Sequence, residues 1–380
     1  MSIEPRKSAQ PGSRKEKHLA ICTDPSRFEV EGDGAGFGAV HFLHDAMPEL
    51  SVTEVDPSIE FLGHRLPFPL FISCMTGGSQ GGFAANRQLA LAAQELGLPV
   101  GLGSIRVALQ HESLVEHFRV KHIARDVPVL ANIGAVQVRD FDHSRIFELL
   151  RRLEVQALVV HLNPGQELFQ EDGDRDFRGL ADALERLCSR CPVPVMVKET
   201  GFGIRPSLAR RLLSRGAAYV DLAGSGGTNW ISVESYRLPQ ERSAESREFQ
   251  SWGLPTAALL LACQDLRGSL LASGGIRSGM DAAKAVALGA ELAGLALPVI
   301  RAVNEGGADA VVRLYRGLEA TLANVMVLTG SRTLEELRRG VAWVEPHLAA
   351  AAEGLRRADD AVPADRRGER VPAGSARATA

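Results

Sequence analysis

The feature that most constrains the fold is a regular alternation of short apolar runs with amphipathic helical patterns. The apolar runs occupy residues 69–74, 99–102, 128–133, 157–162, 193–198, 218–222, 269–273 and 292–297. Helical patterns fill most of the gaps, at 84–96, 144–153, 180–187, 207–215, 256–264 and 280–288. Continuous apolar strands that alternate with helices are typical of a parallel sheet covered by helices. Eight such units predict an α/β fold of the (β/α)8 TIM-barrel type.

The competing architecture is an open, doubly wound parallel sheet. Such sheets normally carry a GxGxxG turn after their first strand, and this sequence has none there. We therefore expect one barrel domain over residues 14–355. The stretches 1–13 and 356–380 are rich in small and charged residues without apolar periodicity, which predicts a disordered tail at each end.

Charge and composition exclude several classes of protein. The formal net charge is -3, so there is no basic excess for sequence-independent binding to nucleic acid. The five cysteines are odd in number and scattered, and no apolar targeting segment or spanning-length apolar window occurs. These features predict reduced thiols in a cytoplasmic protein that does not enter membranes.

Residues at the ends of the predicted strands indicate a phosphorylated cofactor. In a barrel of this type the active site lies at the carboxyl ends of the strands. The run Ser273-Gly274-Gly275-Ile276-Arg277 after the seventh strand fits a phosphate-binding turn, because glycines let backbone N–H groups approach an anion. Lys198 either pairs with an acid such as Glu199 or places a cation beside the cofactor ring.

A second group of residues suggests another anionic ligand. The cluster around Arg14, Lys15 and His18 could close with Arg106 over a diphosphate. The polar stretch 161–173 is too long for a minimal turn, and Glu167 within it could hold a divalent cation between phosphate oxygens. Zinc is disfavoured because HExxH and repeated histidine spacing are missing.

These residues fall in motifs that resemble a known family. The motifs are RKxxHL at 14–19, MTGG at 75–78, GSxR at 103–106, HLNPxQE with QxxGD at 161–174, VKETGFG at 197–203, GGTNW at 226–230 and ASGGIRSG at 272–279. In this order they resemble type 2 isopentenyl-diphosphate isomerases. The resemblance implies interconversion of isopentenyl and dimethylallyl diphosphate by reduced FMN, with NADPH as reductant, Mg²⁺ as cation and no net redox change.

The resemblance also implies roles for individual residues. It assigns FMN contacts to Met75, Thr76, Gly77, Ser104, Asn132, Lys198, Thr228, Gly275, Arg277, Ala296 and Leu297. It assigns the substrate to Arg14, Lys15, His18, Ser104, Ile105, Arg106 and Gln166, catalysis to Gln166, His161 and Asn163, and the metal to Glu167. A homo-oligomer, either tetramer or octamer, is implied as well.

Other functions remain open at this point. An FMN-dependent oxidoreductase such as a 2-hydroxy-acid oxidase would share the barrel, although it would need a histidine base after the sixth or seventh strand. The stretch Gly226–Trp230 supplies none. A binding protein without catalysis, a relative acting on a longer prenyl diphosphate, and a relative recruited for another alkene rearrangement are the remaining alternatives.

Overall fold

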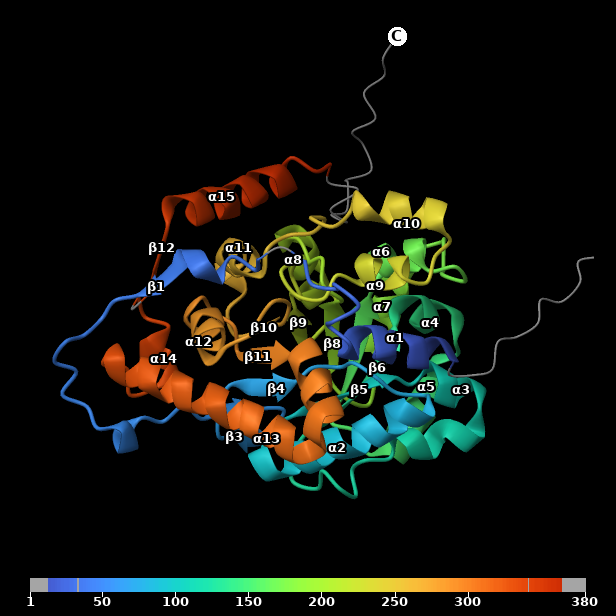
Figure 1. Ribbon diagram of the computed structural model, residues 1–380, viewed down its shortest axis with the longest axis horizontal. Helices are drawn as coiled ribbons and strands as arrows, with labels where there is room; N and C mark the ends of the chain where they lie inside the picture. Colours follow the sequence, from blue (N-terminus) through green and yellow to red (C-terminus); the bar gives the residue numbers. More distant parts are fainter. Residues whose placement is uncertain (1–12, 33, 341, 364–380) are drawn as a thin grey trace, which may run out of the picture.

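A computed structural model describes residues 13–32, 34–340 and 342–363 of the chain (Figure 1). The tails expected at 1–13 and 356–380 lie mostly outside these residues. The carboxyl-terminal boundary was nevertheless placed too early, because helix α15 (Pro346–Asp360) continues past residue 355. Leu348 and Ala352 of this helix are buried, and α15 packs against α11 (Thr256–Ala262).

Eight parallel strands form a closed barrel at the centre of the molecule. They are β4 (Leu70–Ile72), β5 (Val100–Ser104), β6 (Val129–Gly134), β7 (Ala157–Leu162), β8 (Val195–Glu199), β9 (Tyr219–Asp221), β10 (Leu270–Ala272) and β11 (Leu292–Leu295). The strands pair in chain order, and β11 closes the barrel on β4 with Ala293 opposite Leu70. The prediction of a barrel rather than an open sheet is confirmed, and each strand begins and ends within two residues of its predicted run.

Helices connect the strands and cover the outside of the barrel (Figure 1). Besides α11 they are α2 (Gln80–Leu96), α3 (Arg106–Gln110), α4 (Ala135–Asp140), α5 (His143–Leu153), α6 (Pro164–Phe169), α7 (Leu180–Cys188), α8 (Pro206–Ser214), α9 (Trp230–Ser235), α10 (Gln240–Arg247), α12 (Gly279–Ala287) and α13 (Leu297–Leu328). Local sequence signals shape these helices. Ser278 and Asp281 form a capping box at the start of α12, and Gly306 and Gly307 produce a kink within α13.

A hairpin closes the amino-terminal end of the barrel. Strands β2 (Ile59–Phe61) and β3 (His64–Leu66) pair antiparallel. Phe61 and Leu66 are buried in one cluster with barrel-interior side chains such as Phe71, Leu130 and Met196. The hairpin thus completes the lower core and leaves the opposite end of the barrel for the site.

The remaining elements join the two ends of the chain to the barrel. Helix α1 (Ser13–Thr23) packs on α2, α9 and α13. Strand β1 (Val40–Phe42) pairs antiparallel with β12 (Ala342–Val344). The short elements are η1 (Phe37–Ala39), η2 (Val52–Glu54), η3 (Glu112–Phe118), η4 (Gln264–Leu266) and α14 (Leu334–Leu337).

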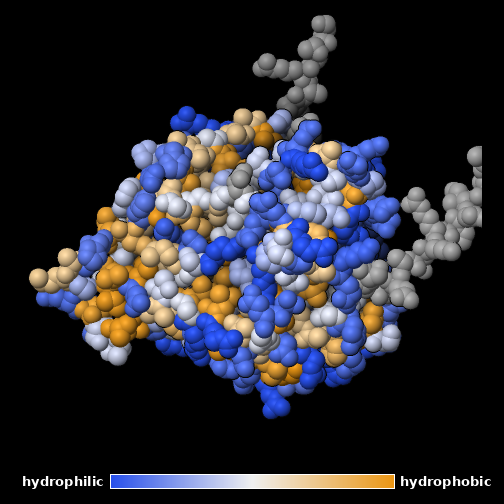
Figure 2. Space-filling model, viewed as in Figure 1, coloured by the Kyte–Doolittle hydropathy of each residue, from blue (hydrophilic) through white to orange (hydrophobic). Residues whose placement is uncertain are grey.

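The face of the molecule in Figure 2 mixes polar and apolar residues. A loop over residues 43–52 carries exposed apolar side chains. The side chains of Leu43, Met47 and Val52 in this loop are exposed, Met47 by 74%. Among the described residues, no helix is long and apolar enough to cross a membrane.

Candidate active site

The carboxyl ends of the barrel strands and helix α1 enclose a cavity of about 240 Å³. Parallel strands of a closed barrel all end at the same rim, so residues far apart in the chain meet there. The predicted site residues that line it are Arg14, Lys15, His18, Met75, Thr76, Gly77, Ser104, Arg106, Asn132, His161, Asn163, Gln166, Glu167, Lys198, Thr228, Gly275, Arg277, Ala296 and Leu297.

Ile105 is the exception among the predicted residues. Its side chain is fully buried in the apolar core, and it is not part of the cavity wall. The turn between β5 and α3 directs Ser104 and Arg106 to the cavity and Ile105 away from it. The backbone N–H of Ile105 donates to the carbonyl of Asn132 at 2.7 Å, so this residue braces the turn.

One side of the cavity has the properties of a phosphate site. Gly274 and Gly275 have φ of 91° and 78°, a region that favours glycine. A Cβ on Gly275 would lie 2.4 Å from the Cβ of Ala35, and one on Gly227 would lie 2.6 Å from the nitrogen of Gly275. Side chains at these positions would therefore fill the space in which backbone N–H groups can meet an anion.

Arg277 supplies a cation to the same side. Its Nε donates to Oε1 of Glu31 at 2.7 Å, which fixes the direction of the guanidinium. Its Nη2 is buried and has no hydrogen-bond partner among the described residues. A buried donor without a partner is costly, so this atom indicates an anionic ligand.

Lys198 lies at the bottom of the cavity and does not form the side-chain pair with Glu199 considered from the sequence. Its Nζ donates to the backbone carbonyl of Glu199 at 2.5 Å. The carboxylate of Glu199 turns away and accepts backbone N–H groups of Thr200 and Gly201, both at 2.6 Å. Burial raises the pKa of Glu199 to about 7, although those N–H groups and Lys198 oppose the shift.

Three cations gather at the mouth of the cavity. Arg14 and Lys15 come from the ordered helix α1, and Arg106 comes from α3. Lys15 Nζ donates to the carbonyl of Ser104 at 3.3 Å. Burial, and then the charges of Arg14 and Arg106, lower the pKa of Lys15 to about 7.

No ion pair joins these three cations to an acid within the described part of the chain. Burial and the proximity of Arg106 also lower the pKa of Arg14. The charges of Glu167 and Glu234 oppose this shift in the pKa of Arg14. Buried like charges repel one another, and a ligand with two or more negative charges would relieve that repulsion. The mouth is therefore built to bind a polyanion.

His161 is held neutral beside these charges. Its Nδ1–H donates to Oδ1 of Asn132 at 2.8 Å, which leaves Nε2 as an acceptor. Burial, followed by the charges of Lys198 and Lys15, lowers the pKa of His161 to about 3. The imidazole is thus uncharged over the physiological pH range.

A chain of side-chain hydrogen bonds orients the amide of Gln166. Its Oε1 accepts from Asn163 Nδ2 at 3.1 Å, and its Nε2 donates to Oε1 of Glu234 at 3.1 Å. Asn163 Nδ2 also donates to Oε1 of Glu167 at 2.9 Å. The second oxygen of Glu167 accepts the backbone N–H of Asp174 at 2.9 Å.

Glu234 is the main functional residue that the sequence reasoning missed. Its carboxylate is fully buried, lies 2.9 Å from Nε2 of His18 and pairs with Arg237. Burial opposes its ionisation, but the hydrogen bond and charge of His18 and the charge of Arg237 lower its pKa. An acid four residues after Trp230 gives no sequence signal of this role, because only the fold brings α1, α6 and α9 together.

Fold and site together define a (β/α)8-barrel enzyme of the FMN-dependent class. The family model described as FMN-dependent dehydrogenase matches residues 167–344. Solved structures share the fold at low identity. A mutant flavocytochrome b2 with benzoylformate aligns with a TM-score of 0.64 at 16% identity, over 92% of this chain and 89% of that one. The monotopic membrane protein (S)-mandelate dehydrogenase aligns with a TM-score of 0.61 at 16% identity, over 89% of this chain and 100% of that one.

The chain belongs to the isopentenyl-diphosphate delta-isomerase family. The relative so named from Borrelia garinii subsp. bavariensis is 41% identical over 88% of this chain and 94% of its own length. The one from Stutzerimonas stutzeri is 44% identical over 86% of this chain and 95% of its own. The one from Halobacterium salinarum is 41% identical over 87% and 93%. The family expected from the sequence motifs is confirmed.

Proposed function

We propose that the protein interconverts isopentenyl and dimethylallyl diphosphate in the cavity beneath α1, with FMN as cofactor. The observation that carries this proposal is the pairing of two anion sites in one cavity. Arg277 and the Gly274–Gly275 turn form the first, and Arg14, Lys15 and Arg106 form the second. Two phosphorylated ligands, a cofactor and a diphosphate, match this arrangement.

The residues present fit FMN. Its phosphate would meet Arg277 Nη2 and the N–H groups around Gly275, and its ring would lie toward Lys198 and Thr200, whose Oγ1 is buried without a partner in the described residues. The FMN contacts proposed from the family are Met75, Thr76, Gly77, Ser104, Asn132, Lys198, Thr228, Gly275, Arg277, Ala296 and Leu297, all of which line the cavity. When bound and reduced, FMN supplies an electron-rich ring and an exchangeable proton. NADPH is the proposed reductant.

Glu167 would hold Mg²⁺ together with the substrate. The described residues contain no cluster of three or more acidic, histidine or cysteine side chains for a metal. One carboxylate is nonetheless enough for Mg²⁺ when substrate phosphates and waters complete its octahedron. The ion would neutralise diphosphate charge at the mouth. We expect Glu167→Gln to raise the Mg²⁺ concentration for half-maximal activity, and an unchanged magnesium titration would contradict this role.

The side chains of the chain itself orient the alkene and exclude water. Arg14, Lys15 and Arg106 would fix the diphosphate, which places the hydrocarbon near His161, Asn163 and Gln166. Because Glu234 and Asn163 fix both ends of the Gln166 amide, its dipole has a defined direction toward the reacting carbons. Because His161 is neutral, it adds no positive charge beside a carbocation-like species.

Oxidation of a 2-hydroxy acid fits the site less well. The turn after β9 carries Asn229, which caps α9 by accepting backbone N–H groups of Ile231 and Ser232 at 2.9 and 3.1 Å. The histidines that line the cavity in the described residues are His18 on α1 and His161 at the end of β7, and neither follows the sixth or seventh barrel strand. A longer prenyl diphosphate is an alternative substrate of the same class.

We further propose a cytoplasmic homo-oligomer, either tetramer or octamer. The exposed side chains of Leu43, Met47 and Val52 support self-association, because monomers rarely expose large apolar patches. Light scattering after size exclusion would give the mass. A monomer at micromolar concentration would contradict this proposal.

The reaction itself has a direct test. The purified protein is loaded with FMN, reduced anaerobically and mixed with isopentenyl diphosphate and Mg²⁺ in deuterated water. We expect NMR to show dimethylallyl diphosphate and deuterium uptake with reduced FMN, and neither with oxidised FMN. A protein that binds FMN but leaves isopentenyl diphosphate unchanged would overturn the proposed activity.

A further inference from the structure

A second cavity, of about 250 Å³, lies between the barrel wall and helices α4, α7 and α8. Its wall is mainly aliphatic and includes Val136, Leu162, Leu180, Leu184, Leu208 and Leu212. An engineered apolar cavity of about 150 Å³ holds one benzene molecule, so by proportion this space holds a chain of about ten carbons. Protein interiors are otherwise packed to crystal density, which makes a space of this size a candidate binding site.

The cavity also has one cation whose hydrogen bonding is incomplete. Arg215 is paired with Asp182 at 3.1 Å and Glu185 at 2.7 Å. Arg211 beside it has a buried Nε without a hydrogen-bond partner among the described residues. The wall thus combines an aliphatic interior with a guanidinium whose buried Nε has no hydrogen-bond partner in the described residues, and this combination suits an anionic amphiphile.

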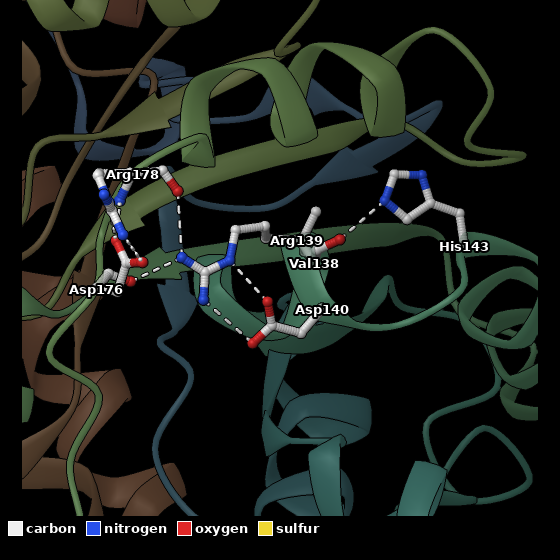
Figure 3. A network of polar contacts seen from close by, with 6 residues as sticks. All are labelled: Val138, Arg139, Asp140, His143, Asp176 and Arg178. Atoms are coloured by element: carbon white, nitrogen blue, oxygen red, sulfur yellow. Dashed lines mark hydrogen bonds and ion pairs between the residues drawn. The ribbon is translucent and has the colours of Figure 1, made fainter.

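A clamped segment covers this cavity. Phe177 lines it, and the carbonyls on either side of Phe177, those of Asp176 and Arg178, accept from Nη1 of Arg139 at 2.7 and 3.2 Å (Figure 3). Arg139 is in turn held by Asp140 in the same network. These hydrogen bonds restrain the backbone on both sides of Phe177.

We propose that this second cavity binds a small amphiphile, with an aliphatic chain of about ten carbons inside and an anionic head on Arg211. The site is distinct from the cavity beneath α1, although Asn163 lies in the wall of both. Its occupant lies under the segment 163–179, which carries Gln166 and Glu167. Binding there would stiffen that segment by filling the space behind it.

Calorimetry on the FMN-loaded protein tests the site with decanoate as probe. We expect one saturable site per chain. Leu184→Trp, which fills the cavity, should abolish binding, and Arg211→Gln should weaken it about tenfold or more. Arg210→Gln is the matched control, because Arg210 pairs with Asp265 at 2.8 Å and is not part of this wall. The same titration with geranyl diphosphate in place of decanoate shows whether the site binds a diphosphate head group or a carboxylate head group.

Three results would overturn the proposal. They are no saturable binding of either probe, binding that survives Leu184→Trp, and displacement of decanoate by isopentenyl diphosphate, which would place the probe beneath α1. Ala181→Leu provides a second cavity-filling variant in case Leu184→Trp does not fold. Equal loss of affinity in Arg210→Gln and Arg211→Gln would contradict the role given to Arg211.

Discussion

Single residues in the site owe their chemistry to burial next to fixed partners. Lys15, His161 and Glu199 have pKa values of about 7, 3 and 7 because the fold removes water from them. The motifs named most of the residues that line the cavity, since many of them follow strand ends that the apolar pattern predicts. They could not identify Glu234 or the inward turn of Ile105, because those depend on how α9 and the β5–α3 turn pack.

The orientation of Gln166 leads to the first prediction. Gln166→Leu removes the amide that Asn163 and Glu234 hold, and we expect turnover to fall on the order of 10²-fold or more. FMN absorbance after desalting should be unchanged. Leu168→Ala on the same helix is the control, because Leu168 is 45% exposed. Wild-type turnover in Gln166→Leu would remove this residue from the catalytic group.

The lowered pKa of Lys15 predicts that kcat/KM depends on pH. Its pKa of about 7 means that the ammonium loses its proton as the pH rises through 7, and the diphosphate then loses one cation. We expect kcat/KM to fall above pH 7 in the wild type. Lys15→Arg should extend the plateau to higher pH, because arginine stays charged. Lys17→Arg, at an exposed position of α1, should leave the profile as it is; identical profiles for all three proteins would refute the assignment.

Helices, strands and their connections position these residues, and the long connection after β7 carries two of them. Segment 163–179 contains α6, carries Gln166 and Glu167, and is fastened by Arg139 of α4 (Figure 3). The apolar patterns of the strands and helices could be read from the sequence. This connection has no apolar periodicity, and its conformation depends on polar contacts. Helix α1 was likewise missed as a helix, because its polar side chains are ordered by the cavity they cover.

The Arg139 clamp makes a prediction at this scale. Arg139→Gln removes hydrogen bonds to the carbonyls of Asp176 and Arg178. We expect amide exchange in 170–179 to accelerate about fivefold, since hydrogen bonds to charged groups contribute on the order of 1 kcal/mol or more. Exchange measured by mass spectrometry tests this, with Arg186→Gln on the exposed side of α7 as the comparison. Unchanged exchange in this segment would show that other contacts hold it.

In the described residues the molecule is a barrel with α1 and α15, the first and last helices, packed against its sides. The eightfold alternation predicted a parallel sheet covered by helices, and the count of eight units without a GxGxxG turn favoured the closed barrel over an open sheet. The end of the domain was harder to predict. Helix α15 is rich in alanine and charge, and what orders it is contact with α8 and α11.

Asp359 gives the prediction at the scale of the molecule. Its buried carboxylate accepts from Arg205 Nη1 at 2.8 Å and Ser207 Oγ at 2.7 Å, and so caps α8 from another part of the chain. Asp359→Ala should lower the free energy of unfolding by about 3 kcal/mol, as for other broken buried pairs. Urea denaturation measures this, and Glu353→Ala should change it by less than about 0.5 kcal/mol. An equally small change in the free energy of unfolding for Asp359→Ala would show that the contact of α15 with α8 does not stabilise the fold.

The β2–β3 hairpin has a consequence for the order in which cofactor and substrate bind and leave. Because the hairpin closes one end of the barrel, cofactor and substrate enter the cavity through the same opening beneath α1. If Arg14 and Lys15 of α1 hold the diphosphate as proposed, a bound substrate would block the path by which FMN leaves the cavity. We therefore expect FMN to escape between turnovers rather than during them.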